Sequence, residues 1–240
     1  MKNQEQSEFD DYASSYDNSL KESLGVFQQS ADQFARYKIE TVKSLLPTPP
    51  STILDFGCGI GRSISHFHDH FESAELYGCD ISEESIAIAR RNYPYSQFWV
   101  CNSTDSLSSY SQKFDLVFLS CVLHHIPKTE WLLWSEALLS VLSPNGYLVV
   151  FEHNPYNPVS RYIVRNSPLD VNAELLTMQE CKSLFIKMGF QVVKAKYSVF
   201  FPFNTRFFNV LDKFLGVIPL GGQYFVMVEN TCILQRAENS

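Results

Sequence analysis

The sequence predicts an α/β fold built on a mainly parallel sheet. Short apolar runs of strand length alternate with longer segments of helical periodicity, and this alternation is typical of strand–helix–strand units. Polar or glycine residues follow these apolar runs where the strands would end. The 240 residues suffice for one large α/β domain with a sizeable core, so we expect a single domain over residues 1–240.

Local signals place the elements in order. The first helix is predicted to begin at a capping-box pattern of Ser30 and Gln33, and Pro47 ends it. Thr177 and Glu180 form a second capping box. The expected strands are 52–56, 75–79, 98–101, 114–119, 147–151, 191–199 and 224–228. Later helices are expected at 62–70, from 82, at 131–142 and at 177–189.

Composition excludes several classes of protein. The formal net charge is -7, from 19 basic and 26 acidic residues without a basic block, which disfavours a nucleic-acid partner. The polar amino terminus has no apolar core and is therefore not a secretory signal. No apolar run reaches membrane-spanning length. Six scattered cysteines indicate reduced core residues and predict a cytoplasmic protein.

Residues 53–63 carry the most specific motif. The apolar run around Asp55 is followed directly by Gly57, Gly59 and Gly61. Glycines tolerate positive φ and let a ligand approach the backbone closely. The spacing differs from the G-x-G-x-x-G of dinucleotide-binding folds, and the turn lacks a phosphate-loop lysine. The alternative is a glycine turn that only joins strand to helix.

This turn resembles motif I of the class I S-adenosylmethionine-dependent methyltransferases, and residues 114–126 resemble motif IV of that family. Together the similar pieces cover about residues 10 to 155. The resemblance implies a doubly wound, seven-stranded, mostly parallel Rossmann-like sheet with an antiparallel last strand. It also implies S-adenosylmethionine as cofactor, S-adenosylhomocysteine as product, and methyl transfer to O or N of a small-molecule, glycan or lipid-linked acceptor. A non-catalytic S-adenosylmethionine-binding module is the alternative.

Ligands of parallel sheets bind outside the carboxyl ends of the strands. The resemblance gives Asp55 a role near the cofactor's ammonium group and Asp80 the ribose hydroxyls, although Asp80 also fits a solvated loop. Ile81 would pack on the adenine, with ordinary core packing as the alternative. Asn102 would bond the adenine edge unless Asp105 does so. The predicted cofactor-binding residues are Asp55, Gly57, Cys58, Gly59, Gly61, Asp80, Ile81, Asn102, Ser103, Ser120 and Tyr16.

The predicted catalytic residues are His125 and His124. His125 follows the fourth strand and has an ordinary pKa near neutrality, which suits a general base, whereas a packing or cofactor-shelf role is the alternative. Glu152 and His153 are rivals for the role of base. Adjacent histidines also suggest a metal site, but neighbouring side chains diverge and no third ligand stands at a favourable spacing. We therefore predict no metal.

Three segments outside the shared core are expected to shape the acceptor site. The resemblance implies an aromatic amino-terminal lid over residues 1–28, and we expect an acceptor-side cap over residues 153–176 and a Phe-rich insertion over residues 200–223. The insertion suggests a homodimer surface or peripheral membrane contact, with core packing as the alternative. The predicted substrate-binding residues are His153, Tyr156 and Arg161, with a solvated helical face as the alternative for Arg161.

Overall fold

The computed structural model describes residues 25–167, 170–199 and 215–231. Contacts between Cα atoms group the chain into two compact units, Met1–Ser103 and Thr104–Ser240. The predicted lid residue Tyr16 lies outside the described residues, as do most of the lid and residues 200–214 of the Phe-rich insertion.

The first unit contains three parallel strands. β1 (Thr52–Phe56) pairs with β2 (Glu75–Asp80), which pairs with β3 (Gln97–Val100). Four successive residues of β1 are buried, as expected for a strand that is covered on both faces. The predicted bounds of β1 are confirmed, and those of β2 and β3 agree within one residue.

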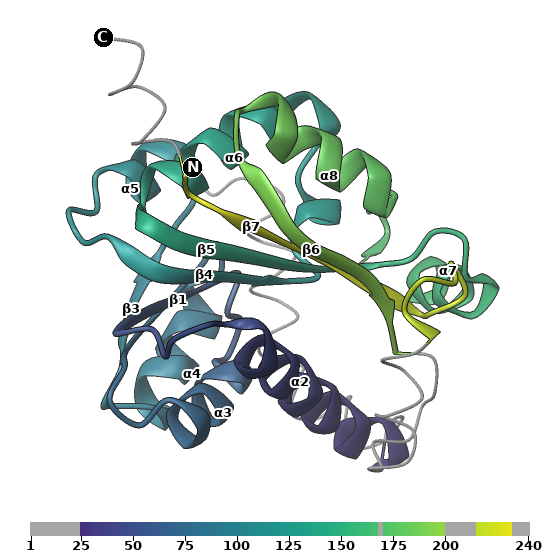
Figure 1. Cartoon of the computed structure of the whole chain (residues 1–240). Coiled ribbons are helices and arrows are strands. Elements are labelled where there is room, and N and C mark those ends of the chain that lie inside the picture. Colours follow the sequence, from purple (N-terminus) through teal and green to yellow (C-terminus); the bar gives the residue numbers. More distant parts are fainter. Residues whose placement is uncertain (1–24, 168–169, 200–214, 232–240) are drawn as a thin grey trace, which may run out of the picture. The chain divides into compact units, whose positions relative to one another are not determined.

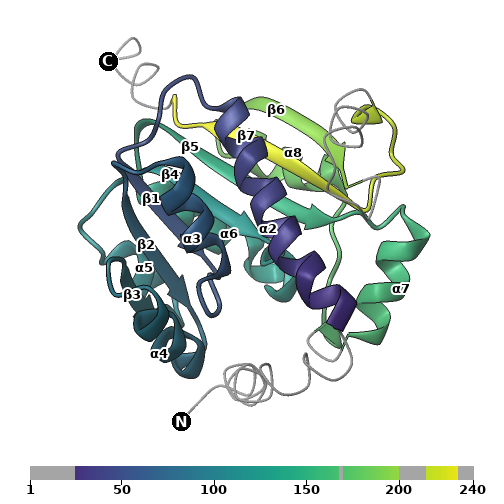
Figure 2. The ribbon, with the colours of Figure 1, turned by 90° about the horizontal axis from the view of Figure 1, so that it is seen from below.

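Three helices accompany these strands (Figures 1 and 2). α3 (Arg62–His70) and α4 (Glu83–Asn92) pack on β2, and α2 (Gly25–Leu45) packs against α3. The predicted capping box at Ser30 is wrong, because α2 begins at Gly25 and Ser30 lies inside it. No proline interrupts the chain between these two positions, so the helix propagates past the predicted start.

The second unit contains four strands. β4 (Phe114–Ser120) is parallel to β5 (Leu142–His153). β5 pairs antiparallel with β7 (Gln223–Glu229), and β7 pairs antiparallel with β6 (Gln191–Ser198). The order of all seven strands is β3-β2-β1-β4-β5-β7-β6. The predicted mostly parallel sheet with an antiparallel last strand is therefore confirmed.

β5 begins earlier than predicted. The strand was predicted to begin at residue 147, whereas residues 142–146 also belong to it. Asn145 donates its N–H to the carbonyl of Asn230 at 3.1 Å, and Asn230 donates to the carbonyl of Gly146 at 2.9 Å. Asn145 has φ 62°, a conformation that asparagine tolerates better than most residues. These backbone bonds extend the strand through a sequence that reads as a turn.

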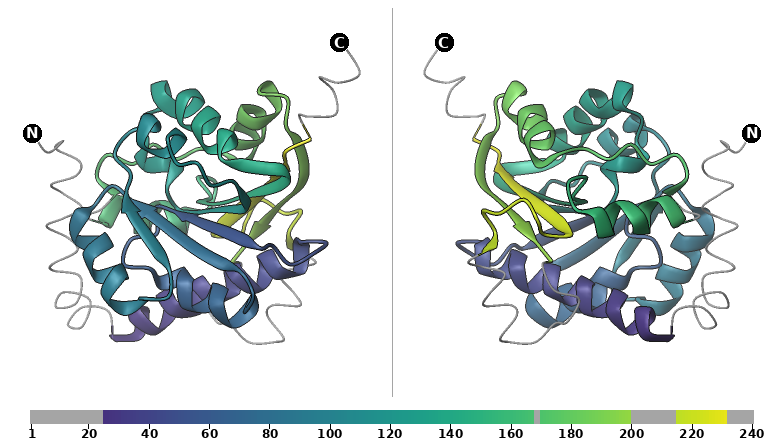
Figure 3. Two further views of the ribbon diagram at one scale, coloured as in Figure 1. Left: turned by 90° about the vertical axis from the view of Figure 1, so that its left-hand side faces the viewer. Right: turned by 90° about the vertical axis from the view of Figure 1, so that its right-hand side faces the viewer.

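The helices of the second unit include α6 (Trp131–Ser140) and α8 (Met178–Lys187), which contact each other and lie side by side in Figure 3. α6 ends at Ser140 rather than at residue 142, because Leu142 already belongs to β5. α5 (Thr104–Ser108) contacts α6. α7 (Pro158–Asn166) begins in the predicted acceptor-side cap.

The described residues can also be searched for membrane-spanning helices and for disulfides. Among the described residues, no helix has the length and apolar character needed to cross a membrane. The cysteines of the described segments, Cys58, Cys79, Cys101, Cys121 and Cys181, are all free.

Candidate functional site

The glycine turn after β1 has the conformation that its sequence predicts. Gly57, Gly59 and Gly61 have φ values of 73°, 52° and 86°. A Cβ on Gly61 would lie 2.8 Å from the ring of Tyr93, so close packing requires this glycine. Among the described residues, a Cβ on Gly59 would meet nothing within 4 Å. Gly59 therefore borders open space, into which a ligand can approach the backbone.

Asp80 ties the end of β2 to this turn. Its Oδ2 accepts the N–H of Gly59 at 2.8 Å, and its Oδ1 accepts the N–H of Ser82 at 3.0 Å. Gly57 donates to the carbonyl of Cys79 at 2.8 Å. The structure thus brings the turn and the half-buried Asp80 together at one edge of the strands.

Asp55 is an ionisable group buried without full compensation. Its side chain is 2% exposed, and its Oδ2 has no hydrogen-bond partner among the described residues. Burial raises the pKa of Asp55 to about 7, and the carboxylate of Asp80 adds to this shift, whereas Ser63 and Lys38 oppose it. A buried carboxyl oxygen of this kind suits a cationic ligand group.

Lys38 is a member of this group that sequence reasoning missed. It is 6% exposed, although lysine is seldom buried. The sequence indicates that Lys38 is buried, because it lies one helical turn from Phe34 and from Val42 on the apolar stripe of α2. A lysine on such a stripe predicts a buried charged partner.

The remaining predicted cofactor residues of this unit differ in how far their side chains are exposed. A Cβ on Gly78 would lie 2.9 Å from the Sγ of Cys58, so this thiol packs against β2. Burial raises the pKa of Cys58, which keeps it a neutral thiol. Ile81 is half-buried, whereas Asn102 and Ser103 are exposed just after β3. Of these side chains, Ile81, Asn102 and Ser103 are accessible at the carboxyl ends of the strands.

In the second unit a buried carboxylate organises the segment after β4. Glu152 is 0% exposed, and its Oε1 accepts the N–H groups of Val122 at 3.0 Å and Leu123 at 2.7 Å. Its Oε2 lies 2.6 Å from Nδ1 of His124. Glu152 therefore holds the short 3₁₀ helix η1 (Leu123–His125) in place.

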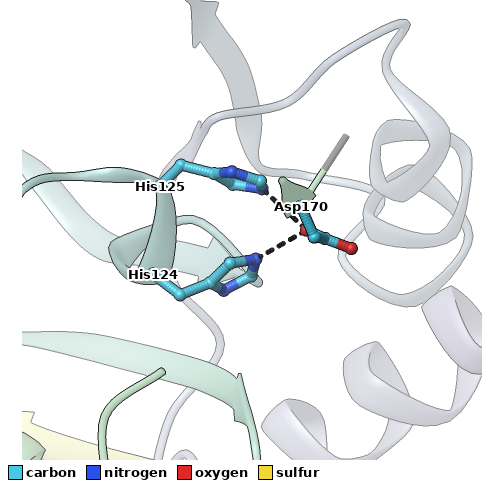
Figure 4. A group of neighbouring side chains, drawn as sticks. All are labelled: His124, His125 and Asp170. Carbon is cyan, nitrogen blue, oxygen red and sulfur yellow. Dashed lines mark hydrogen bonds and ion pairs between the residues drawn. The ribbon is translucent and has the colours of Figure 1, made fainter. Parts of the chain in front are cut away.

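The predicted catalytic histidines converge on Asp170. Its Oδ1 lies 3.2 Å from Nε2 of His124 and 3.4 Å from Nε2 of His125 (Figure 4). The side chain of His124 is 1% exposed, and that of His125 is 24% exposed. Asp170 follows α7 and was not predicted, because it lies 46 residues from His124. The expectation that the histidine side chains diverge and lack a third partner is wrong.

The pKa values of the two histidines shift in opposite directions. Although burial opposes the charged form, Glu152 and then the hydrogen bond to Asp170 raise the pKa of His124 to about 10. Burial lowers the pKa of His125 to about 4, and the neighbouring charge of His124 adds to this shift. His125 is accordingly neutral near pH 7 but a weak proton acceptor. Burial raises the pKa of Glu152, but His124 outweighs it and holds this pKa below its ordinary value.

Four hydrogen bonds hold the segment that carries these histidines. The indole Nε1 of Trp131 donates to the carbonyls of Leu123 at 3.1 Å and Ile126 at 2.8 Å. Glu174 donates its N–H to the carbonyl of His124 at 2.7 Å. Its side chain accepts the N–H of Lys128 at 2.8 Å. Residues 170–174 are thereby joined to η1.

The other predicted residues of this unit differ in their exposure and in their contacts with the two histidines. The rings of His153 and His124 lie edge to face with centroids 5.3 Å apart. Cys121, beside the half-buried Ser120, has φ 60° and accepts a bond from Gln223 at 3.3 Å. Tyr156 and Arg161 are exposed.

A glycine turn and acidic residues at the ends of parallel strands are typical of α/β proteins that bind a nucleotide-like cofactor. Known proteins agree with this class. The sequence model of the methyltransferase domain family matches residues 53–146. A trans-aconitate 2-methyltransferase of Variovorax paradoxus (strain S110) is 29% identical over 106 residues, which are 44% of this chain and 40% of that protein. One of Azoarcus sp. (strain BH72) is 27% identical over 140 residues, 57% of this chain and 54% of that protein.

Solved structures share the fold. An S-adenosylmethionine-dependent methyltransferase of Archaeoglobus fulgidus has a TM-score of 0.65 and 16% identity, covering 82% of this chain and 94% of that chain. The magnesium protoporphyrin IX methyltransferase of Synechocystis PCC 6803, solved with bound S-adenosylmethionine, has a TM-score of 0.62 and 17% identity, covering 95% and 97%. The chain spans about half the length of the curated relatives. Residues 53–146 thus match the methyltransferase domain family, and the chain shares its fold with solved S-adenosylmethionine-dependent methyltransferases.

Proposed function

We propose that this chain transfers a methyl group from S-adenosylmethionine to a small-molecule acceptor. The observation that carries the proposal is the carboxyl of Asp55, whose buried Oδ2 has no hydrogen-bond partner among the described residues. It lies in β1, which leads directly into the glycine turn. The cofactor's ammonium group is the cation that this oxygen would bind.

The other residues of the first unit fit the rest of the cofactor. Asp80, which lies beside the glycine turn, would accept hydrogen bonds from the ribose hydroxyls. Gly59 would admit the methionine part beside its open side. Ile81, Asn102 and Ser103 would contact the adenine. The bound sulfonium supplies an activated methyl, so the protein mainly has to position the acceptor.

We assign the acceptor step to the second unit. His124 would act as a positioning residue, because both of its ring nitrogens already face carboxylates. His125 has the more accessible ring and would act on the acceptor side. Whether it serves as a general base stays a prediction, as do the substrate roles of His153, Tyr156 and Arg161.

The names of the curated relatives favour a small acceptor, and a small carboxylic acid is the first class to test. Transfer to O or to N stays open, as do glycan and lipid-linked acceptors. Peripheral membrane contact and a homodimer through the Phe-rich insertion rest on residues 200–214, outside the described part of the chain.

Calorimetry with S-adenosylhomocysteine tests the cofactor. We expect wild-type binding in the micromolar range or tighter, at about -8 kcal/mol. Asp80→Asn should weaken binding at least about tenfold, because hydrogen bonds to a charged group contribute about 1.5–3 kcal/mol. Asp69→Asn, an exposed acid of α3, is the matched control and should leave binding unchanged. No binding to the wild type at millimolar ligand would refute the proposal.

A transfer assay separates the enzyme from a non-catalytic binding module. Radiolabelled S-adenosylmethionine is incubated with trans-aconitate and with a panel of small acids, alcohols and amines. An enzyme forms a methylated product with at least one of them, and His125→Ala should slow this transfer by about 10²-fold while S-adenosylhomocysteine still binds. A protein that binds the cofactor but never transfers methyl would be the binding module.

A further inference from the structure

We propose that His124, His125 and Asp170 form a binding site for one divalent transition-metal ion. Nothing in the cofactor assignment requires such a site, which lies wholly within the second unit. The three side chains offer two imidazole nitrogens and a carboxylate oxygen within 4.8 Å of one another. Figure 4 shows both rings directed at Asp170.

The separations of the ligand atoms suit a metal ion. Oδ1 of Asp170 lies 3.2 Å from Nε2 of His124 and 3.4 Å from Nε2 of His125. An ion in tetrahedral coordination, with ligands at about 2.0–2.2 Å, separates its ligand atoms by about 3.3–3.6 Å. The observed separations are close to this range. Because both histidines present Nε2, each can keep its proton on Nδ1 and use the Nε2 lone pair.

The surroundings of His124 resemble the outer shell of a metal site. Glu152 already accepts two backbone N–H bonds, so it is an acceptor toward Nδ1 of His124 at 2.6 Å. A histidine ligand usually donates its second ring N–H to a carboxylate in this way, which fixes its tautomer and raises its basicity. Glu152 and Asp170 also supply negative charge that a divalent ion would offset.

The ligands are held before any ion binds. Glu152 fixes the backbone of η1 from β5, and the indole of Trp131 fixes it from α6. The bond from Glu174 to the carbonyl of His124 links the segment after Asp170 to the same turn. Such support for the ligand backbone lowers the ordering cost of binding.

The donor set predicts which ions bind. Two imidazoles and one carboxylate suit zinc, cobalt or iron(II), whereas magnesium prefers oxygen ligands only. Three protein ligands leave a fourth position for water or another small ligand. The 24% exposed side chain of His125 gives the site access to solvent.

Zinc titration of the full chain tests the proposal. The protein is prepared without a polyhistidine tag, stripped with a chelator, and titrated with zinc chloride in a calorimeter. We expect one ion per chain and no magnesium binding at the same concentrations. Both Asp170→Asn and His125→Ala, which change partly exposed side chains, should weaken zinc binding at least about 100-fold, and Glu152→Gln by about 10–100-fold.

Two controls exclude other ligands. His68→Ala removes an exposed histidine of α3, and Cys121→Ser removes the thiol nearest to the cluster in sequence. Both variants should bind zinc like the wild type, and circular dichroism should confirm that every variant is folded. The absence of zinc binding would overturn the proposal. Zinc binding that survives both Asp170→Asn and His125→Ala would overturn it as well.

Discussion

At the scale of residues, the buried carboxyl of Asp55 lowers the stability of the fold and is proposed to bind the cofactor. Its carboxyl is buried beside Asp80, and its Oδ2 has no hydrogen-bond partner among the described residues. Burying such a group costs free energy of folding, and active sites often contain costs of this kind. If the cofactor's ammonium group binds there, the same oxygen gains a partner of opposite charge.

Asp55→Asn should therefore affect stability and binding in opposite directions. Folding raises the pKa of Asp55 from 3.8 to about 7, so the native state keeps a proton that the unfolded chain releases. This group's contribution to stability thus falls as pH rises from about 4 to about 7. We expect the variant to match the wild type below pH 4 and to be about 1–3 kcal/mol more stable above pH 7.

Urea unfolding across this pH range measures the effect, and comparison with the wild type cancels the contributions of other carboxyl groups. At pH 8 the same variant should bind S-adenosylhomocysteine at least about tenfold more weakly, since a charged partner is lost. A variant that is less stable at every pH would contradict our account of Asp55.

The sequence identified those site residues whose partners are local. Gly59 and Asp80 follow from glycine spacing and a strand end, whereas Asp55 was implied by the resemblance, and the structure places Gly59 and Asp80 in direct contact. Asp170 could not be found in this way, because its contact with His124 depends on how the chain returns after α7. The cofactor roles of these residues stay predictions until binding is measured.

At the scale of elements, capping residues in the sequence predicted some helix starts correctly and others wrongly. One helix was predicted to start at Ser82 and another at the capping box of Thr177, and both side chains accept backbone N–H groups. Ser30 has a similar pattern but lies inside α2, since a capping sequence acts only where the preceding residues leave the helix. β5 was predicted too short because its first residues pair with Asn230, a partner far along the chain.

The capping box of α8 gives a prediction about stability. Oγ1 of Thr177 accepts the N–H of Glu180 at 3.1 Å, and Oε2 of Glu180 accepts the N–H of Thr177 at 2.7 Å. Thr177→Ala should lower the free energy of unfolding by about 1 kcal/mol. The check is a lower urea midpoint with an unchanged m-value.

Thr177→Ser keeps the hydroxyl and serves as the control, with a urea midpoint close to that of the wild type. Glu180 adds a pH dependence, because its backbone bond to Thr177 holds the pKa of this carboxyl below its ordinary value. Its contribution is present above that ordinary value and is lost as pH falls through the folded pKa. An alanine variant as stable as the wild type at pH 7 would show that the capping box contributes nothing.

At the scale of the whole molecule, the residues of the two candidate sites come from different units of the chain. Residues 1–103 hold Tyr16 and all the predicted cofactor residues except Ser120, and residues 104–240 hold the histidine cluster. The two proposals therefore concern different segments of the chain. A ligand of one site should protect a different set of backbone amides from a ligand of the other.

Hydrogen exchange over the full chain tests this separation. A ligand present at 100 times its Kd stabilises the native state by about 2.7 kcal/mol, which slows opening-limited exchange by about 100-fold. S-adenosylhomocysteine should slow exchange first at residues 57–64 and 80–85, and zinc at residues 122–125 and 170–174. Peptides from residues 1–28 test the lid prediction in the same experiment. Protection by S-adenosylhomocysteine that spares the glycine turn would contradict the cofactor assignment, because Gly57 to Gly61 would then lie outside the binding site.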